Sequence, residues 1–208
     1  MIIGYWNYTV YPTYLSLILA LMGCFWAMEG VLLPAVLCLM LCGFVDCIDG
    51  RIARACKRRS RDEKRFGVQI DSLCDLIAFG LLPGIIGFSV GLDGVLGIAV
   101  VCIFVLAALV RLAYFNVRTA ADEESSDSGH LSYVGLPVTA VSLLIPLLCL
   151  FHMILPQQVF IVCYGLVLLG TAMAFVWPFT MKKPGLKKVI LMIACGAVLM
   201  AALLIIYA

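Results

Sequence analysis

Long apolar stretches alternate with short polar segments along almost the whole chain. A helix that crosses a bilayer needs about 20 consecutive, mostly apolar residues. Stretches of that kind cover residues 12–28, 31–56, 67–91, 94–117, 133–154, 157–179 and 187–207. They predict an all-α, polytopic membrane bundle with a core of six helices and an extra C-terminal helix, which can also be peripheral to that core. Because the polar segments are short, we expect a single integral membrane domain over residues 1–208 and no soluble module.

The composition supports a membrane protein. Hydrophobic residues make up 64% of the chain and the mean hydropathy is +1.14, whereas a soluble domain contains roughly 45–50% apolar residues. The net charge is only +2. We therefore expect the lipid bilayer, and no nucleic acid, as a partner.

Basic residues gather in three of the polar segments. Apart from three arginines inside apolar stretches, every Lys and Arg lies within residues 57–65, at 118 or within 182–188. The segments around Glu29, Asp93 and His152 carry no Lys or Arg. Alternate threading of seven spans places the three basic segments on the same side, which the positive-inside rule makes cytoplasmic. The N-terminus is therefore expected on the cytoplasmic side.

Four aspartates lie inside or beside apolar stretches, where a bilayer makes charge costly and an acid usually marks a functional site. Asp46 and Asp49 are near the end of the second stretch, and Asp71 and Asp75 are near the start of the third. From the rise of a helix, Asp49 and Asp71 lie roughly 6–8 Å below the cytosolic ends of their spans, and the other two roughly 12 Å below. Two antiparallel helices would therefore bring the four carboxylates together in a cavity open to the cytosol.

Such a cluster needs counter-charge. Hard divalent cations prefer oxygen ligands such as carboxylates, so the four acids predict a metal site. A single intramembrane Asp can also serve as a polar contact between helices, but four acids at this spacing favour the metal site.

Small and basic residues share the helical faces of the acids. Gly50 and Gly67 lack side chains, so a bulky ligand can approach the backbone there. Ala53 keeps the same face small, and Arg54 is placed at the mouth, where it can donate two hydrogen bonds to a phosphate. Acids for metal, room for a ligand and an Arg for phosphate indicate a phosphoryl-transfer site at the membrane surface.

The spacing of these residues resembles a known pattern, D-x2-D-G-x2-A-R followed by a spacer and G-x3-D-x3-D. The pattern is that of the CDP-alcohol phosphotransferase family, and the chain matches all eight of its positions between Asp46 and Asp75. The spacer, residues 55–66, is longer than is common in the family, and its additional charged residues are expected to extend a cytosolic loop.

The resemblance implies a usually dimeric, six-helix enzyme that binds two divalent cations, Mg²⁺ or Mn²⁺. The implied metal ligands are Asp46, Asp49, Asp71 and Asp75. Asp71 and Asp75 are the implied catalytic residues, with Asp75 as the base for the incoming hydroxyl. The implied contacts of the CDP group are Asp49, Gly50, Ala53, Arg54, Gly67 and Asp71.

Three further segments are similar to those of the serine-using members of the family, the phosphatidylserine synthases. They are residues 71–83 (D-S-L-C-D-L-I-A-F-G-L-L-P), 111–116 (R-L-A-Y-F-N) and 133–137 (Y-V-G-L-P). Tyr114 departs from the pattern, because those enzymes often carry Arg there. The similarity implies transfer of the phosphatidyl group from CDP-diacylglycerol to L-serine with release of CMP. We expect the site to face the cytoplasm, in the cytoplasmic membrane of a prokaryote.

Arg111 lies about two helical turns inside the fourth stretch, where a lone cation is costly. Its guanidinium can snorkel to the cytosolic surface or bind an anion, either the serine carboxylate or a substrate phosphate. Arg118 follows on the same face and can assist.

Two other functions are compatible with the aspartates. A sibling enzyme would use glycerol 3-phosphate or an inositol phosphate as acceptor, but a phosphorylated acceptor calls for a second basic cluster, and only Arg111 and Arg118 are obvious. A cation transporter is disfavoured, because the acids are confined to the cytosolic half of the membrane and no internal repeat is evident.

Overall fold

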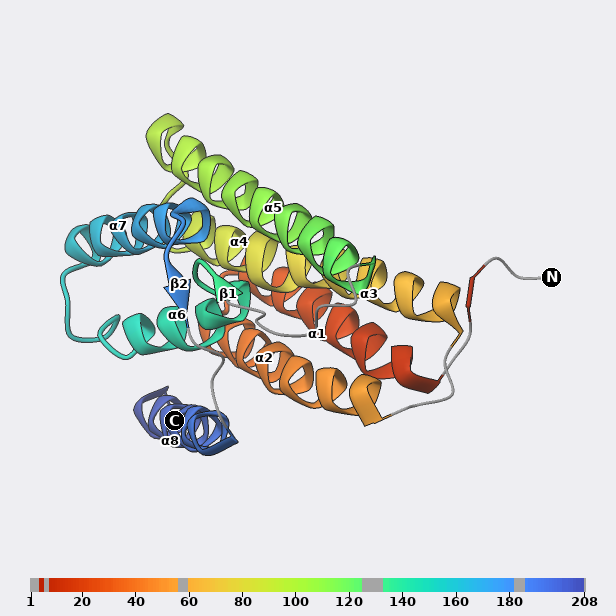
Figure 1. The fold of residues 1–208 in the computed structure, drawn as a ribbon. Coiled ribbons are helices and arrows are strands. Elements are labelled where there is room, and N and C mark those ends of the chain that lie inside the picture. Colours follow the sequence, from red (N-terminus) through yellow and green to blue (C-terminus); the bar gives the residue numbers. More distant parts are fainter. Residues whose placement is uncertain (1–3, 6–7, 56–59, 125–132, 182–185, 208) are drawn as a thin grey trace.

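The computed structural model describes residues 4–5, 8–55, 60–124, 133–181 and 186–207, and these residues form a bundle of helices (Figure 1). The helices are α1 (Tyr11–Met28), α2 (Leu32–Ala55), α3 (Arg61–Asp75), α4 (Leu82–Ser89), α5 (Val95–Glu124), α6 (Val141–Cys149), α7 (Gln157–Val176) and α8 (Leu186–Tyr207). Short 3-10 helices cover Tyr8–Val10 and Val138–Ala140, and a π-helical segment covers Leu76–Leu81. The predicted all-α class is confirmed.

Five helical segments of the described chain are long and apolar enough to cross a membrane. They are Tyr11–Met28, Leu32–Gly50, Arg61–Ser89, Val95–Ala120 and Gln157–Val176. Two shorter apolar helices accompany them, Val138–Cys149 and Met192–Tyr207. The protein is therefore an integral membrane protein, and the expected C-terminal helix is present as α8, which lies beside α6 at the edge of the bundle (Figure 1).

The stretch 133–154 does not form one long helix as its hydrophobicity suggested. Tyr133–Val134 is the short strand β1, which pairs antiparallel with β2 (Thr180–Met181). Gly135 follows with a φ of +79°, a conformation that favours glycine, and helical structure begins only after Pro137. Hydrophobicity alone does not reveal this turn.

The third span begins earlier than its apolar stretch. Ser60 Oγ accepts a hydrogen bond from the Glu63 N–H over 3.1 Å, and the Glu63 carboxylate accepts one from the Ser60 N–H over 2.7 Å. This reciprocal cap satisfies two N–H groups of the first turn and starts α3 at Arg61. Residues 61–66 are therefore helical, and the expectation that the charged residues of the spacer extend a loop was wrong for this part of it.

The same span changes its helical geometry in the middle. The Leu82 N–H donates to the Ile77 carbonyl, five residues back, and Pro83 has no N–H with which to continue an α-helical ladder. The π-helical segment joins α3 to α4 without a break. It directly follows Asp75, the last residue of α3.

The packed core runs through the bundle, and its largest buried side chains come from the π-helical segment, α5 and α7. Phe79, Phe104, Phe175 and Tyr164 are fully or almost fully buried, and the Tyr164 hydroxyl donates to the Pro83 carbonyl over 2.9 Å. The start of α1, the end of α2 and the start of α3 lie together at the other end of the bundle (Figure 1). That end carries the candidate site.

Candidate active site

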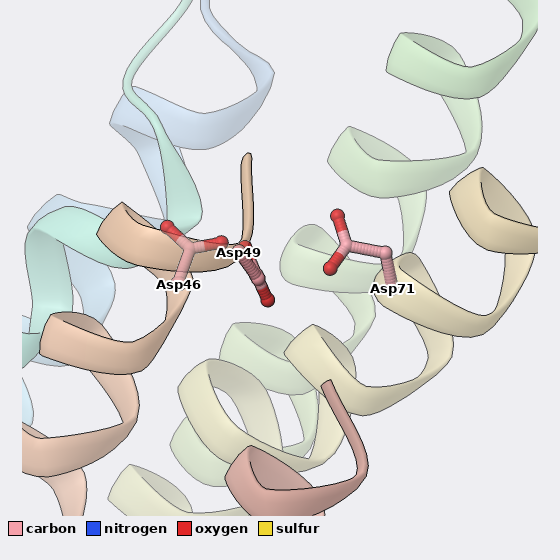
Figure 2. A group of neighbouring side chains, drawn as sticks. All are labelled: Asp46, Asp49 and Asp71. Carbon is pink, nitrogen blue, oxygen red and sulfur yellow. The ribbon is translucent and has the colours of Figure 1, made fainter. Parts of the chain in front are cut away.

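Asp46 and Asp49 on α2 meet Asp71 on α3. One carboxylate oxygen from each lies within 4.8 Å of the others, and Figure 2 shows Asp71 directed from α3 toward the two aspartates of α2. Asp49 is buried, with 5% of its surface exposed, and the other two are half-buried. The sequence predicted that these carboxylates meet. They do so because α2 and α3 are joined by a short connection and present the aspartates on facing sides.

The donor set fits a divalent cation. Metal–oxygen distances of about 2.0–2.6 Å place two ligands of one cation up to about 5 Å apart. The three oxygens satisfy this limit as they stand, and carboxylate oxygens suit Mg²⁺ and Mn²⁺. Asp46, Asp49 and Asp71 can therefore hold a cation between α2 and α3.

Asp75 lies beside this group but is not one of its three members. It follows Asp71 by one helical turn and is half-buried where α3 gives way to the π-helical segment. Its position in the helix puts it on the same face of α3 as Asp71, about 40° further round the axis. Its predicted roles as metal ligand and base stay predictions.

Thr13 on α1 is a site residue that the sequence did not reveal. Its side chain is buried, and its hydroxyl donates to Asp49 Oδ2 over 3.5 Å. Polar side chains commonly form such hydrogen bonds between helices in membranes. The two residues are separated by 36 positions, so no local pattern links them.

A cavity of about 90 Å³ opens next to the aspartates. It is lined by Thr9, Val10, Thr13, Asp49, Gly50, Gly67, Val68 and Asp71. Four of these residues, Asp49, Gly50, Gly67 and Asp71, are predicted contacts of the CDP group. Pockets for whole small molecules measure about 300–1,000 Å³, so this cavity suits a phosphate-sized group and a larger ligand would extend beyond it.

Ala53 and Arg54 belong to the last turns of α2, which runs to Ala55. The helix therefore continues in the phase that places them on the face of Asp49 and Gly50. Their side chains lie outside the part of the chain described in atomic detail. Their predicted contacts with the CDP group stay predictions.

Arg111 on α5 is buried, with 6% of its surface exposed. Its Nε donates to the Leu136 carbonyl over 3.2 Å, and its guanidinium lies 5.8 Å from the centre of the Phe115 ring. A Cβ on Gly135 would lie 3.4 Å from the same Nε, so the turn of residues 135–136 packs closely on the guanidinium. Arg111 is thus held by protein groups and does not extend a solvated head to the surface.

Arg111 lines a different cavity from the aspartates. This second cavity measures about 230 Å³ and is lined by Val110, Arg111, Tyr114, Phe175, Val176, Trp177 and Pro178. Arg118 is exposed, and its guanidinium lies over the Tyr114 ring at 5.9 Å. Neither arginine is among the residues that line the cavity of Asp49 and Asp71.

Asn116, at the end of the segment 111–116, touches α3. The Ser72 hydroxyl donates to Asn116 Oδ1 over 2.9 Å, and Asn116 Nδ2 donates to Gln69 Oε1 over 3.5 Å. Through Arg111 and Asn116, this segment contacts both the 133–137 segment and the helix of Asp71. The three segments that resemble serine-using enzymes are therefore joined in space.

Comparison with known proteins gives the family. The model of the CDP-alcohol phosphatidyltransferase family matches residues 6–181. A CDP-diacylglycerol–serine O-phosphatidyltransferase of Helicobacter pylori is 32% identical over 180 residues, which cover 84% of this chain and 70% of that protein. The enzyme of the same name from Saccharomyces cerevisiae is 39% identical over 94 residues, 45% of this chain and 33% of its own.

An archaeal protein is also similar. The archaetidylserine synthase of Methanothermobacter thermautotrophicus is 32% identical over 133 residues, which cover 64% of this chain and 50% of that protein. With the family model covering most of the chain and the aspartates of its pattern gathered at one site, the protein belongs to the CDP-alcohol phosphatidyltransferase family.

Proposed function

We propose that the protein is a phosphatidylserine synthase, which transfers the phosphatidyl group of CDP-diacylglycerol to the hydroxyl of L-serine and releases CMP. The observation that carries this proposal is the meeting of Asp46, Asp49 and Asp71 beside a cavity lined by Gly50 and Gly67. Family membership supports the reaction class, and the names of the relatives support serine as the acceptor.

The aspartates would hold two divalent cations, Mg²⁺ or Mn²⁺, with Asp75 completing the ligand set. Bound cations neutralise the pyrophosphate and stabilise the charge that develops on the leaving phosphate. Gly50 and Gly67 leave room for the phosphates to approach the backbone. Arg54 would donate hydrogen bonds to a phosphate at the mouth of the site.

The chemical step exchanges one P–O bond for another. The serine hydroxyl oxygen forms a bond to the phosphorus that carries the diacylglycerol, and the bond from that phosphorus to the oxygen of CMP breaks. Asp75 would take the hydroxyl proton, because a carboxylate within hydrogen-bond reach can act as a general base. CMP departs with the electron pair of the broken bond.

The choice of acceptor is supported by the charges around the site. An acceptor that carries its own phosphate would need additional basic side chains in the cavity. Among the described residues that line the cavity of Asp49 and Asp71, none is basic. A small zwitterion such as serine fits this lining better than glycerol 3-phosphate or an inositol phosphate.

The site would face the cytoplasm, from the cytoplasmic membrane of a prokaryote, and the enzyme would act as a homodimer. The clustering of basic residues beside the site supports this orientation. The lipid tails of CDP-diacylglycerol would remain in the bilayer while its head group reaches the aspartates.

Release of CMP tests the proposal directly. Purified protein is given CDP-diacylglycerol and Mn²⁺ or Mg²⁺, and serine, glycerol 3-phosphate and inositol phosphate are compared as acceptors. We expect CMP release to depend on serine. Faster release with either phosphorylated acceptor would assign the protein to a sibling activity, and no release with any of the three would contradict the proposal.

A further inference from the structure

Two residues of α3 are hydrogen-bonded to α5 through one side chain. Ser72 donates to Asn116 Oδ1 over 2.9 Å, and Asn116 Nδ2 reaches Gln69 Oε1 over 3.5 Å. A primary amide carries both an acceptor oxygen and donor hydrogens, so Asn116 can bond to both residues at once. We call Gln69, Ser72 and Asn116 the amide clamp.

The amide clamp and the aspartates occupy different faces of α3. At about 100° per residue, Asp71 and Asp75 lie within about 40° of each other, and Gln69 and Ser72 are centred about 110° further round the helix. Attachment of the clamp face to α5 therefore fixes the rotation of α3 about its own axis. A carboxylate about 6 Å from that axis moves about 1 Å when the helix turns by 10°.

Within α3 itself, apolar packing does little to set this rotation. Cys74 is the only residue of α3 that is buried, and the first turns of the helix are charged. The buried π-helical segment holds the end of α3, whereas the surface of α3 itself has no close-packed ridge to define its orientation. The hydrogen bonds of the amide clamp provide a directional contact in its place.

We propose that Asn116 is a positioning residue that acts through Ser72 and sets the rotation of α3, so that Asp71 and Asp75 face α2. Its effect on turnover rests on the proposed function, whereas its effect on the aspartates can be measured by metal binding alone. The link also gives a physical role to two of the similar segments, because Ser72 belongs to residues 71–83 and Asn116 to residues 111–116.

The test uses Asn116→Leu, Ser72→Ala and the double variant. Thr119→Val is the matched control, because the Thr119 hydroxyl donates to the Phe115 carbonyl on its own helix and makes no link to α3. Each purified protein is assayed for Mn²⁺ affinity by the electron paramagnetic resonance of free Mn²⁺. CMP release is then measured over a range of serine and CDP-diacylglycerol concentrations.

We expect Asn116→Leu to lower kcat by about 10- to 100-fold, because a displacement of about 1 Å at a reacting group has effects of that size. Mn²⁺ affinity should fall as well, while the KM for serine changes less than about threefold, as for a residue that makes no contact with substrate. Ser72→Ala should act in the same direction. The double variant should lose little more than the worse single variant, because both remove the same bond.

Several results would overturn the proposal. Wild-type kcat and Mn²⁺ affinity in Asn116→Leu would show that the clamp does not position the aspartates. A raised serine KM with unchanged kcat would instead make Asn116 a substrate contact, and additive losses in the double variant would show two independent effects. If Asn116→Leu fails to fold, Ser72→Ala decides the matter by the same measurements. A wild-type protein that binds Mn²⁺ but releases no CMP contradicts the proposed function. In that case the amide clamp is still tested by comparing the Mn²⁺ affinities of the variants with that of the wild type.

Discussion

Replacement of Arg111 by alanine separates two roles of this buried cation. If the guanidinium holds the serine carboxylate, its removal leaves that carboxylate without a partner at a cost of about 2–5 kcal/mol. At 1.4 kcal/mol per factor of ten, the KM for serine would rise about 30- to 4,000-fold. The KM for CDP-diacylglycerol would change little.

The alternative role is support of the turn at residues 135–136. The hydrogen bond from Arg111 to the Leu136 carbonyl is charge-assisted and contributes about 1.5–3 kcal/mol. The contact with the Phe115 ring contributes about 0.5–2 kcal/mol. Loss of both would lower the free energy of unfolding by about as much as loss of a serine contact would weaken binding, so only separate assays distinguish the two roles.

We therefore predict the outcome of two measurements on Arg111→Ala and Arg111→Lys. Separate titrations of serine and CDP-diacylglycerol should show a large rise in the serine KM for the alanine variant. The lysine variant should recover only part of the loss, because an ammonium cannot form the two-pronged contact of a guanidinium. Lys64→Ala, which removes a positive charge from the exposed start of α3, serves as the control for net charge.

Thermal unfolding of the same variants completes the test. A serine KM within about threefold of wild type, together with a lower unfolding temperature, would refute the serine contact and assign Arg111 to the turn. Weaker binding of CDP-diacylglycerol alone would make Arg111 a phosphate contact. Assignment of Arg111 to the turn would agree with the separation of the two cavities, because Arg111 lines one and Asp49 and Asp71 line the other.

Three further predictions concern the aspartates and Thr13. Chelation with EDTA should abolish CMP release and either Mg²⁺ or Mn²⁺ should restore it, whereas full turnover in excess EDTA would exclude a metal-dependent reaction. Asp71→Asn and Asp75→Asn should each lower kcat by about 10²- to 10⁴-fold while the protein still inserts and folds, as judged by size-exclusion chromatography; near-normal turnover by the Asp75 variant would exclude it as the base. Thr13→Val should raise the Mn²⁺ concentration needed for activity by a few-fold, because the long hydrogen bond to Asp49 is weak. Thr13→Ser keeps the hydroxyl and should behave like wild type, and identical metal dependence of both variants would refute a role for this bond.

The convergence of the aspartates was predictable because it depends on local geometry. Asp46 and Asp49 share a face of one helix, Asp71 lies on the next, and a short connection forces the two helices to run antiparallel. Helical phase and rise were therefore enough to bring these residues together. The capping pair Ser60 and Glu63 was also readable from its spacing, but a search for apolar stretches passes over a charged helix start.

Contacts between distant segments were not predictable in this way. The partner of Arg111 is the backbone carbonyl of Leu136, and any residue can supply a carbonyl. Thr13 reaches Asp49 only because α1 packs against α2. Likewise, the strand at Tyr133–Val134 is paired with β2, which lies beyond α6 and α7 in the chain.

The π-helical segment Leu76–Leu81 divides the third span into a part that carries the aspartates and a part that packs in the core. A π-helical turn holds one more residue than an α-helical turn, which shifts the phase of everything beyond it by about 100°. Asp71 and Asp75 precede the shift, whereas the fully buried Leu82 and Ile86 follow it. The phase shift thus relates the orientation of the carboxylates to that of the buried side chains along one continuous helix. A single insertion or deletion between Asp75 and Pro83 would misalign one part with respect to the other, so the length of this segment should tolerate less change than its composition.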